Sequence, residues 1–158
     1  GLTSASVYSI SLYCEPVSLG GWNTAMDAKG QVFPKTCKDY RDLYPDNLGC
    51  YPFYFYYEPP SDFGQKVFGA KSTYHLISKT AYEYEFQKEG VTGFTNGNDV
   101  ALYSSEEENK IKIDRRSLDY TYTNGMALKI GPSQFNSNLM IESGVCKVTE
   151  VKQGKPIF

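Results

Sequence analysis

Hydrophobic and polar residues alternate along most of the chain with a period of two, as expected for β-strands that bury one face. The clearest segment is AYEYEFQ, where Tyr82, Tyr84 and Phe86 share one face and Glu83 and Glu85 share the other. Similar short segments, rich in β-branched and aromatic residues, occur at 7–14, 99–103, 109–113, 118–123, 126–130, 138–142 and 145–151. The alternation therefore predicts an all-β chain.

A helical period is almost absent. No segment keeps an apolar period of 3.6 residues over three turns, and only KDYRDLY at 38–44 favours a short helix. About 8–11 short strands favour an antiparallel β-sandwich or barrel, because an open sheet of that size would leave an apolar face in water. We expect residues 1–158 to form one disulfide-stabilised β domain with at most one short helix.

Asn-Gly occurs at 96–97 and at 124–125, and this dipeptide is typical of hairpin turns. Around the second one, a two-residue loop would place Tyr122 opposite Ala127 and divide the apolar residues between both faces. A three-residue loop pairs Tyr122 with Leu128 and keeps one apolar face. We therefore expect a hairpin here, with a three-residue loop and a bulge.

Aromatic residues dominate the segment YPFYFYY at 51–57. Alternation places Phe53, Phe55 and Tyr57 on one face and Tyr54 and Tyr56 on the other. Such a strand is either central and covered on both sides, or it presents its second face as an exposed platform. The pattern does not choose between the two.

Tyrosine also stands out in the composition, with 14 Tyr, 9 Phe and 1 Trp among 158 residues. Tyrosine and tryptophan dominate the energetics of protein interfaces, and their rings stack on sugars. The sole tryptophan, Trp22, lies in the least strand-like stretch of the chain, at 15–50, and long ordered loops often carry function. The candidate binding residues are therefore Trp22, Tyr54 and Tyr56, although these tyrosines also fit ordinary half-buried sheet positions.

The charge argues against nucleic acid and anionic membranes as partners, because the net charge is -2 and both need clustered Lys and Arg. The most basic stretch, KIKIDRR at 110–116, is interrupted by isoleucines and an aspartate and follows three glutamates. No apolar run approaches the roughly 18 residues of a membrane span. We expect a monomer without a membrane span.

The four cysteines are Cys14, Cys37, Cys50 and Cys146, and none has CxxC spacing. With a single histidine in the chain, this favours two disulfides over a zinc site, and hence a secreted protein. Three pairings are possible, of which we favour Cys37–Cys50 and Cys14–Cys146. Four buried thiols in a cytosolic protein are the alternative. We expect no metal and no cofactor.

A catalytic site has weak sequence support. His75 could lie across a hairpin from Glu83 and Glu85, a set of the kind that small secreted cyclising ribonucleases use. Such enzymes bring a second histidine and a prominent helix, which this chain lacks. The GxSxG, HExxH, P-loop and GxGxxG motifs are also absent.

Three functions remain. The first is a secreted protein-binding module, an effector- or inhibitor-like protein that acts in virulence or competition by engaging a host or competitor protein without catalysis. The alternative is a lectin-like module that binds a glycan through Trp22 and exposed tyrosines. The third is a small ribonuclease or other hydrolase around His75.

Overall fold

The computed structural model describes residues 8–47, 49–88, 92–95, 100–104, 109–130 and 134–153. These residues form the strands β1 (Tyr8–Asn23), β2 (Phe53–Tyr57), β3 (Phe63–Phe68), β4 (Ala70–Lys79), β5 (Glu83–Lys88), β6 (Thr92–Thr95), β7 (Val100–Ser104), β8 (Asn109–Asp114), β9 (Asp119–Ile130) and β10 (Gln134–Gln153). Two short helices, α1 (Thr24–Ala28) and α2 (Cys37–Leu43), follow β1.

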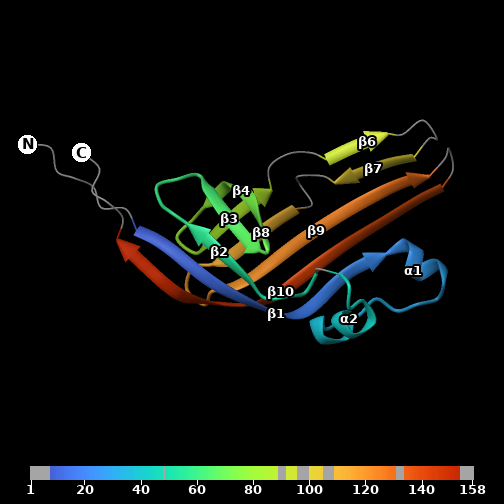
Figure 1. Ribbon diagram of the computed structural model, residues 1–158, viewed down its shortest axis with the longest axis horizontal. Helices are drawn as coiled ribbons and strands as arrows, with labels where there is room; N and C mark the ends of the chain where they lie inside the picture. Colours follow the sequence, from blue (N-terminus) through green and yellow to red (C-terminus); the bar gives the residue numbers. More distant parts are fainter. Residues whose placement is uncertain are drawn as a thin grey trace, which may run out of the picture.

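The strands form an antiparallel barrel. Its order is β1-β2-β3-β4-β5-β8-β9-β10, and β10 closes the barrel because it pairs with β1 as well as with β9 (Figure 1). Each barrel strand therefore has two neighbours, and β2 is central, between β1 and β3. The predicted all-β sandwich or barrel class is confirmed, in its barrel form.

A sheet extension projects from one end of the barrel (Figure 1). It consists of the far halves of β9 and β10 together with the hairpin β6–β7, and β7 pairs with β9 from Val100 opposite Ile130 to Tyr103 opposite Ala127. The hairpin is inserted in the sequence between β5 and β8, which are themselves paired in the barrel. The extension thus leaves the closure of the barrel intact.

The barrel interior is filled mainly by aromatic side chains. As the alternation predicts, Phe53, Phe55 and Tyr57 are buried whereas Tyr54 and Tyr56 face outward. A glycine makes room for one of these rings, because a Cβ on Gly64 would lie 2.4 Å from Cζ of Phe55. Twelve buried residues form this core: Leu12, Cys14, Phe53, Phe55, Tyr57, Tyr74, Phe86, Ile111, Ile113, Tyr120, Tyr122 and Cys146.

The hairpin predicted at 124–125 is wrong, because β9 runs straight through Asn124 and Gly125. Asn124 pairs with Asn109 of β8 on one side and with Met140 of β10 on the other. The pairing with β8 and with β10 keeps the backbone extended at this point, and it outweighs the local preference of Asn-Gly for a turn. The segments predicted at 138–142 and 145–151 are likewise parts of one strand, β10. The other Asn-Gly, at 96–97, lies outside the described residues.

The structure has two short helices where the sequence predicts at most one. The predicted helix corresponds to α2, whereas α1 spans 5 residues, too few to show a helical period. The side chain of Asn23 caps α1 by accepting hydrogen bonds from the amides of Ala25 and Met26. Neither helix of the described chain has the length and apolar character needed to cross a membrane.

Both disulfides form with the pairing that the sequence favours. Cys14 and Cys146 face each other across β1 and β10 and join the two strands inside the barrel. Cys37 and Cys50 join the start of α2 to the segment that leads into β2. The second disulfide thereby holds the helical segment over one end of the barrel.

Candidate functional site

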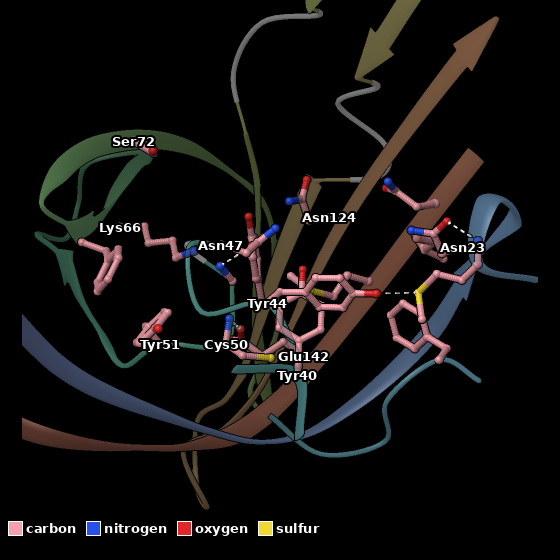
Figure 2. A pocket seen from close by; sticks show the side chains of 18 of the residues that line it. Asn23, Tyr40, Tyr44, Asn47, Cys50, Tyr51, Lys66, Ser72, Asn124 and Glu142 are labelled. Carbon is pink, nitrogen blue, oxygen red and sulfur yellow. Dashed lines mark hydrogen bonds between the residues drawn. The ribbon is translucent and has the colours of Figure 1, made fainter. Parts of the chain in front are cut away.

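One end of the barrel opens into a cavity of about 530 Å³, which we call the polar cavity. Its walls come from the segment 23–51, the β3–β4 hairpin, β9 and β10. Figure 2 shows Lys66 and Tyr51 on one side, Asn23 on the opposite side, and Glu142 and Cys50 between them. A volume between about 300 and 1,000 Å³ is typical of small-molecule sites.

Glu142 is the most buried charged residue of the polar cavity, with 2% of its surface exposed. Its Oε1 accepts a hydrogen bond from the amide of Cys50 at 3.0 Å, and its Oε2 accepts one from the hydroxyl of Tyr120 at 2.7 Å. Burial raises the pKa of the Glu142 carboxyl, while these two donors and the nearby Lys66 and Arg41 oppose the rise. The protein therefore already supplies donors to both carboxyl oxygens.

Cys50 is held in a strained backbone conformation beside this carboxyl. Its φ of 63° lies in the left-handed region, which a residue other than glycine adopts at a cost. Three contacts maintain it. They are the disulfide to Cys37, the hydrogen bond that the Cys50 amide donates to Glu142, and the hydrogen bond that Nη1 of Arg41 donates to the Cys50 carbonyl. The loop before β2 is thus fixed beside the Glu142 carboxyl, in the wall of the polar cavity.

Lys66 brings a positive charge to the same cavity from β3. Its Nζ lies 3.8 Å from the ring centroid of Tyr122 and 4.9 Å from that of Phe53. Burial lowers the pKa of Lys66, and the nearby Glu142 opposes this shift. No described residue accepts a hydrogen bond from this ammonium, whose three N–H donors therefore have the aromatic rings as neighbours.

Tyr122, which lines the polar cavity, interacts with a second buried tyrosine, Tyr74. Burial raises the pKa values of Tyr74 and Tyr122, and a hydrogen bond between their hydroxyls raises the pKa of Tyr74 and lowers that of Tyr122. Both phenols therefore stay protonated at neutral pH. The ring of Tyr122 is therefore a neutral neighbour of the Lys66 ammonium.

The rim of the polar cavity combines amide side chains with aromatic rings. Tyr51 stacks on Phe68 with a centroid distance of 5.6 Å, and the Tyr44 hydroxyl lies 3.3 Å from Sδ of Met26. Four asparagines also line it: Asn23, Asn47, Asn124 and Asn138. Such a rim offers both hydrogen-bond donors and acceptors, together with ring faces for stacking.

The sulfur atoms of Cys37 and Cys50 and a carboxyl oxygen of Glu142 lie within 4.8 Å of one another. Metal ligation by cysteine needs a free thiolate, and these two sulfurs are joined in a disulfide. This group of residues is therefore a structural clamp.

The predicted binding residues do not line the polar cavity, and they do not form one surface. Trp22 is 47% exposed near the end of β1, and its indole N–H donates to Oγ of Ser137. Tyr54 and Tyr56 lie on the outside of β2, with Tyr54 beside Tyr13 at a centroid distance of 5.2 Å. Trp22 follows Tyr13 by nine positions along β1 and is thus separated from the two tyrosines.

The proposed catalytic set is likewise spread over the outside of the barrel. His75 pairs with Gln87 in the sheet and contacts the ring of Phe63, while a register shift places Glu85 opposite Ser78. The carboxylate of Glu85 pairs with Lys110 at 3.6 Å, and Glu83 lies opposite Asp114. None of the three candidate residues lines either described cavity.

Lys66 and Glu142 were not among the candidate residues from the sequence, and Cys50 was expected only as a disulfide partner. One signal was available for Glu142, because it lies an even number of residues before Cys146 on a strand. Side chains two or four positions apart on a strand share a face, so an inward-facing Cys146 implies an inward-facing Glu142. Lys66 offered no comparable signal, since a lysine between two polar turns normally faces water.

Comparisons with known proteins give no guide to function: no family model, no curated protein and no solved structure matches the chain.

Proposed function

We propose that this protein binds a small anionic ligand in the polar cavity and that Lys66 is the residue that anchors it. The observation that carries the proposal is the Lys66 ammonium, which lines the cavity without a hydrogen-bond acceptor from any described residue. A cation in a partly dehydrated cavity attracts a carboxylate or phosphate more strongly than a cation in water.

The remaining lining supports a ligand with a polar or aromatic body. The Glu142 carboxyl already accepts hydrogen bonds from the Cys50 amide and the Tyr120 hydroxyl, so both of its oxygens have partners within the protein. The asparagine amides match hydroxyl groups of a ligand, and the stacked pair Tyr51–Phe68 matches a ring. We infer binding without catalysis, with a small ligand in place of the protein partner that the sequence analysis favours.

The test is a thermal-shift and calorimetric screen of small carboxylates and phosphates, with neutral sugars in the same panel. For any acid that binds, Lys66→Met should weaken the affinity at least tenfold, because a charge-assisted hydrogen bond contributes about 1.5–3 kcal/mol. Lys71→Met, which removes an exposed lysine of β4, is the matched control and should leave the affinity unchanged. Equal affinities of the wild-type protein and Lys66→Met, or a panel in which only neutral sugars bind, would contradict the role of Lys66.

A second proposal is protein binding by the outer tyrosines of the barrel. Tyr54 and Tyr56 are 42% and 40% exposed, their rings stack at 6.2 Å, and Tyr13 extends the row. Exposed, mutually packed aromatic rings are typical of interface hot spots. A partner found on an array of extracellular proteins should be lost in the double variant Tyr54→Ala, Tyr56→Ala and kept in Tyr82→Ala, which removes another exposed tyrosine.

An extracellular location supports both proposals. The two disulfides are compatible with an oxidising compartment, where secreted binding proteins act. We therefore propose that the protein is secreted and meets its ligand or partner outside the cell.

A further inference from the structure

A second cavity, of about 330 Å³, opens at the opposite end of the barrel, where β2 ends and β5 begins. We call it the apolar cavity. Buried side chains of Leu12, Phe55 and Phe86 line its inner part, and Ile10, Ile113 and Leu118 add further walls. No described residue lines both cavities, so the two sites are separate within this part of the chain.

The closed middle of the barrel explains this separation. Phe53 packs edge-on against Tyr120 at a centroid distance of 5.2 Å, and the Cys14–Cys146 disulfide lies in the same buried cluster. Neither Phe53 nor Tyr120 nor the disulfide lines the apolar cavity. A ligand in the apolar cavity therefore does not reach Lys66.

Among the residues that the structure describes, Arg115 is the only charged one that lines the apolar cavity. Its guanidinium lies 4.5 Å from the ring centroid of Tyr84, and its Nη1 donates to the carbonyl of Thr80. These two contacts hold the cation at the rim, while its other N–H groups are available to a ligand, since no described residue accepts from them.

The charge of Arg115 acts on Tyr57, a buried residue that lines the apolar cavity. It lowers the pKa of Tyr57, although burial, Tyr84 and Asp62 together raise that pKa overall. The carboxylate of Asp62 would therefore repel an anion bound at this end of the barrel. The carboxylate of Asp114 instead accepts hydrogen bonds from the amides of Arg116 and Ser117.

We propose that the apolar cavity binds a medium-chain alkyl carboxylate, with the chain against Phe55 and Phe86 and the carboxylate on Arg115. A narrow apolar interior with one cation at its entrance matches a ligand with an alkyl body and one anionic end. Neutral alkanes lack the group that Arg115 would bind, and small hydrophilic acids lack the chain that the interior would bury.

The first test is a calorimetric titration of the wild-type protein with hexanoate, octanoate and decanoate, each below its micelle concentration, and with decanol. The affinity should rise about fourfold for each methylene that enters the cavity, and decanol should bind at least tenfold more weakly than decanoate. An affinity that is independent of chain length, or equal for decanol and decanoate, would overturn the proposal. This series needs no variant and therefore does not depend on the folding of one.

The second test locates the carboxylate. Arg115→Gln should weaken decanoate binding about tenfold and leave decanol binding unchanged, whereas Asp62→Asn should strengthen decanoate binding. Arg116→Gln is the matched control, because Arg116 lies over Tyr82, which does not line the cavity. An equal loss in Arg115→Gln and Arg116→Gln would assign the binding to general surface charge and overturn the site.

Lys66→Met separates this inference from the proposed function of the polar cavity. The variant should bind decanoate as the wild-type protein does, because Lys66 does not line the apolar cavity. A loss of decanoate binding in Lys66→Met would place the carboxylate in the polar cavity instead.

Discussion

Glu142 shows at the scale of single residues how the polar cavity is built. A buried carboxyl needs donors, and the Cys50 amide and Tyr120 hydroxyl provide them. Each donor in turn belongs to a group that the fold fixes, since Cys50 is disulfide-bonded and Tyr120 is 2% exposed. The position of the carboxyl is therefore determined by contacts that do not depend on a ligand.

Replacing this residue should reveal its contribution. Glu142→Gln keeps the size of the side chain but replaces one carboxyl oxygen by an NH₂ group. Either the Cys50 amide or the Tyr120 hydroxyl then faces an N–H donor where it had an acceptor. We expect a loss of about 1–3 kcal/mol in the free energy of unfolding, measured with urea at neutral pH. Glu15→Gln, on the exposed face of β1, should change it by less than about 0.5 kcal/mol.

The pH dependence of this loss follows from the raised pKa of Glu142. The folded state holds the proton more tightly than the unfolded state, so the contribution of this carboxyl is complete below the unfolded pKa. It is lost as the pH rises through the folded pKa. The stability advantage of the wild-type protein over Glu142→Gln should therefore grow as the pH falls from about 8 to about 5. A constant or shrinking advantage would contradict the assignment.

At the scale of elements, the segment between β1 and β2 forms the cover of the polar cavity. The Cys37–Cys50 disulfide closes a stretch of 13 residues, and Leu19 of β1 packs in the same small cluster. Since the barrel core is a separate cluster, the cover should loosen without loss of the barrel.

The double variant Cys37→Ser, Cys50→Ser tests this. We expect a loss of about 3 kcal/mol in stability and a loss of ligand binding in the polar cavity, with decanoate binding in the apolar cavity retained. The control is Cys14→Ser, Cys146→Ser, which removes a link over 132 residues inside the barrel and should cost about 5 kcal/mol. Loss of both binding activities in the first variant would show that the cover and the barrel fold as one unit.

The pairing of β1 with β10 has its own requirement for glycine. A Cβ on Gly144 would lie 2.0 Å from the carbonyl oxygen of Glu15 and 2.8 Å from the Tyr120 ring. Gly144→Ala should therefore cost about 1–3 kcal/mol in urea unfolding, because neither the backbone nor the buried ring can move freely. Gly20→Ala in β1, whose new Cβ would have a single neighbour at 4.0 Å, should cost less than about 1 kcal/mol.

The same elements show what the sequence could predict. Alternation identified the buried face of β2 because Phe53, Phe55 and Tyr57 are periodic over the whole strand. It failed at Asn124-Gly125, where pairing with β8 and β10 decides the backbone conformation. Pairings between segments far apart in the sequence leave no local pattern. The polar cavity was missed for that reason, since Lys66 and Glu142 meet only when the barrel closes.

At the scale of the whole molecule, the barrel has two chemically different ends. One end holds Lys66 and Glu142 among amides and tyrosines, and the other holds Arg115 above an apolar interior. The chain carries a net charge of -2, yet a basic side chain lines each cavity. This arrangement is what supports ligand binding as the function.

The most direct test of ligand binding in the polar cavity is a titration of the ¹⁵N-labelled protein with the tightest acid from the screen, followed by amide chemical shifts. We expect the largest shifts at Cys50, Lys66 and Tyr122, which surround the ammonium and the carboxyl. The Lys66→Met variant should show only small shifts at the same acid concentration. Shifts confined to Tyr13, Tyr54 and Tyr56 on the outside of the barrel would contradict a ligand site in the polar cavity and favour the outer tyrosines as the functional surface.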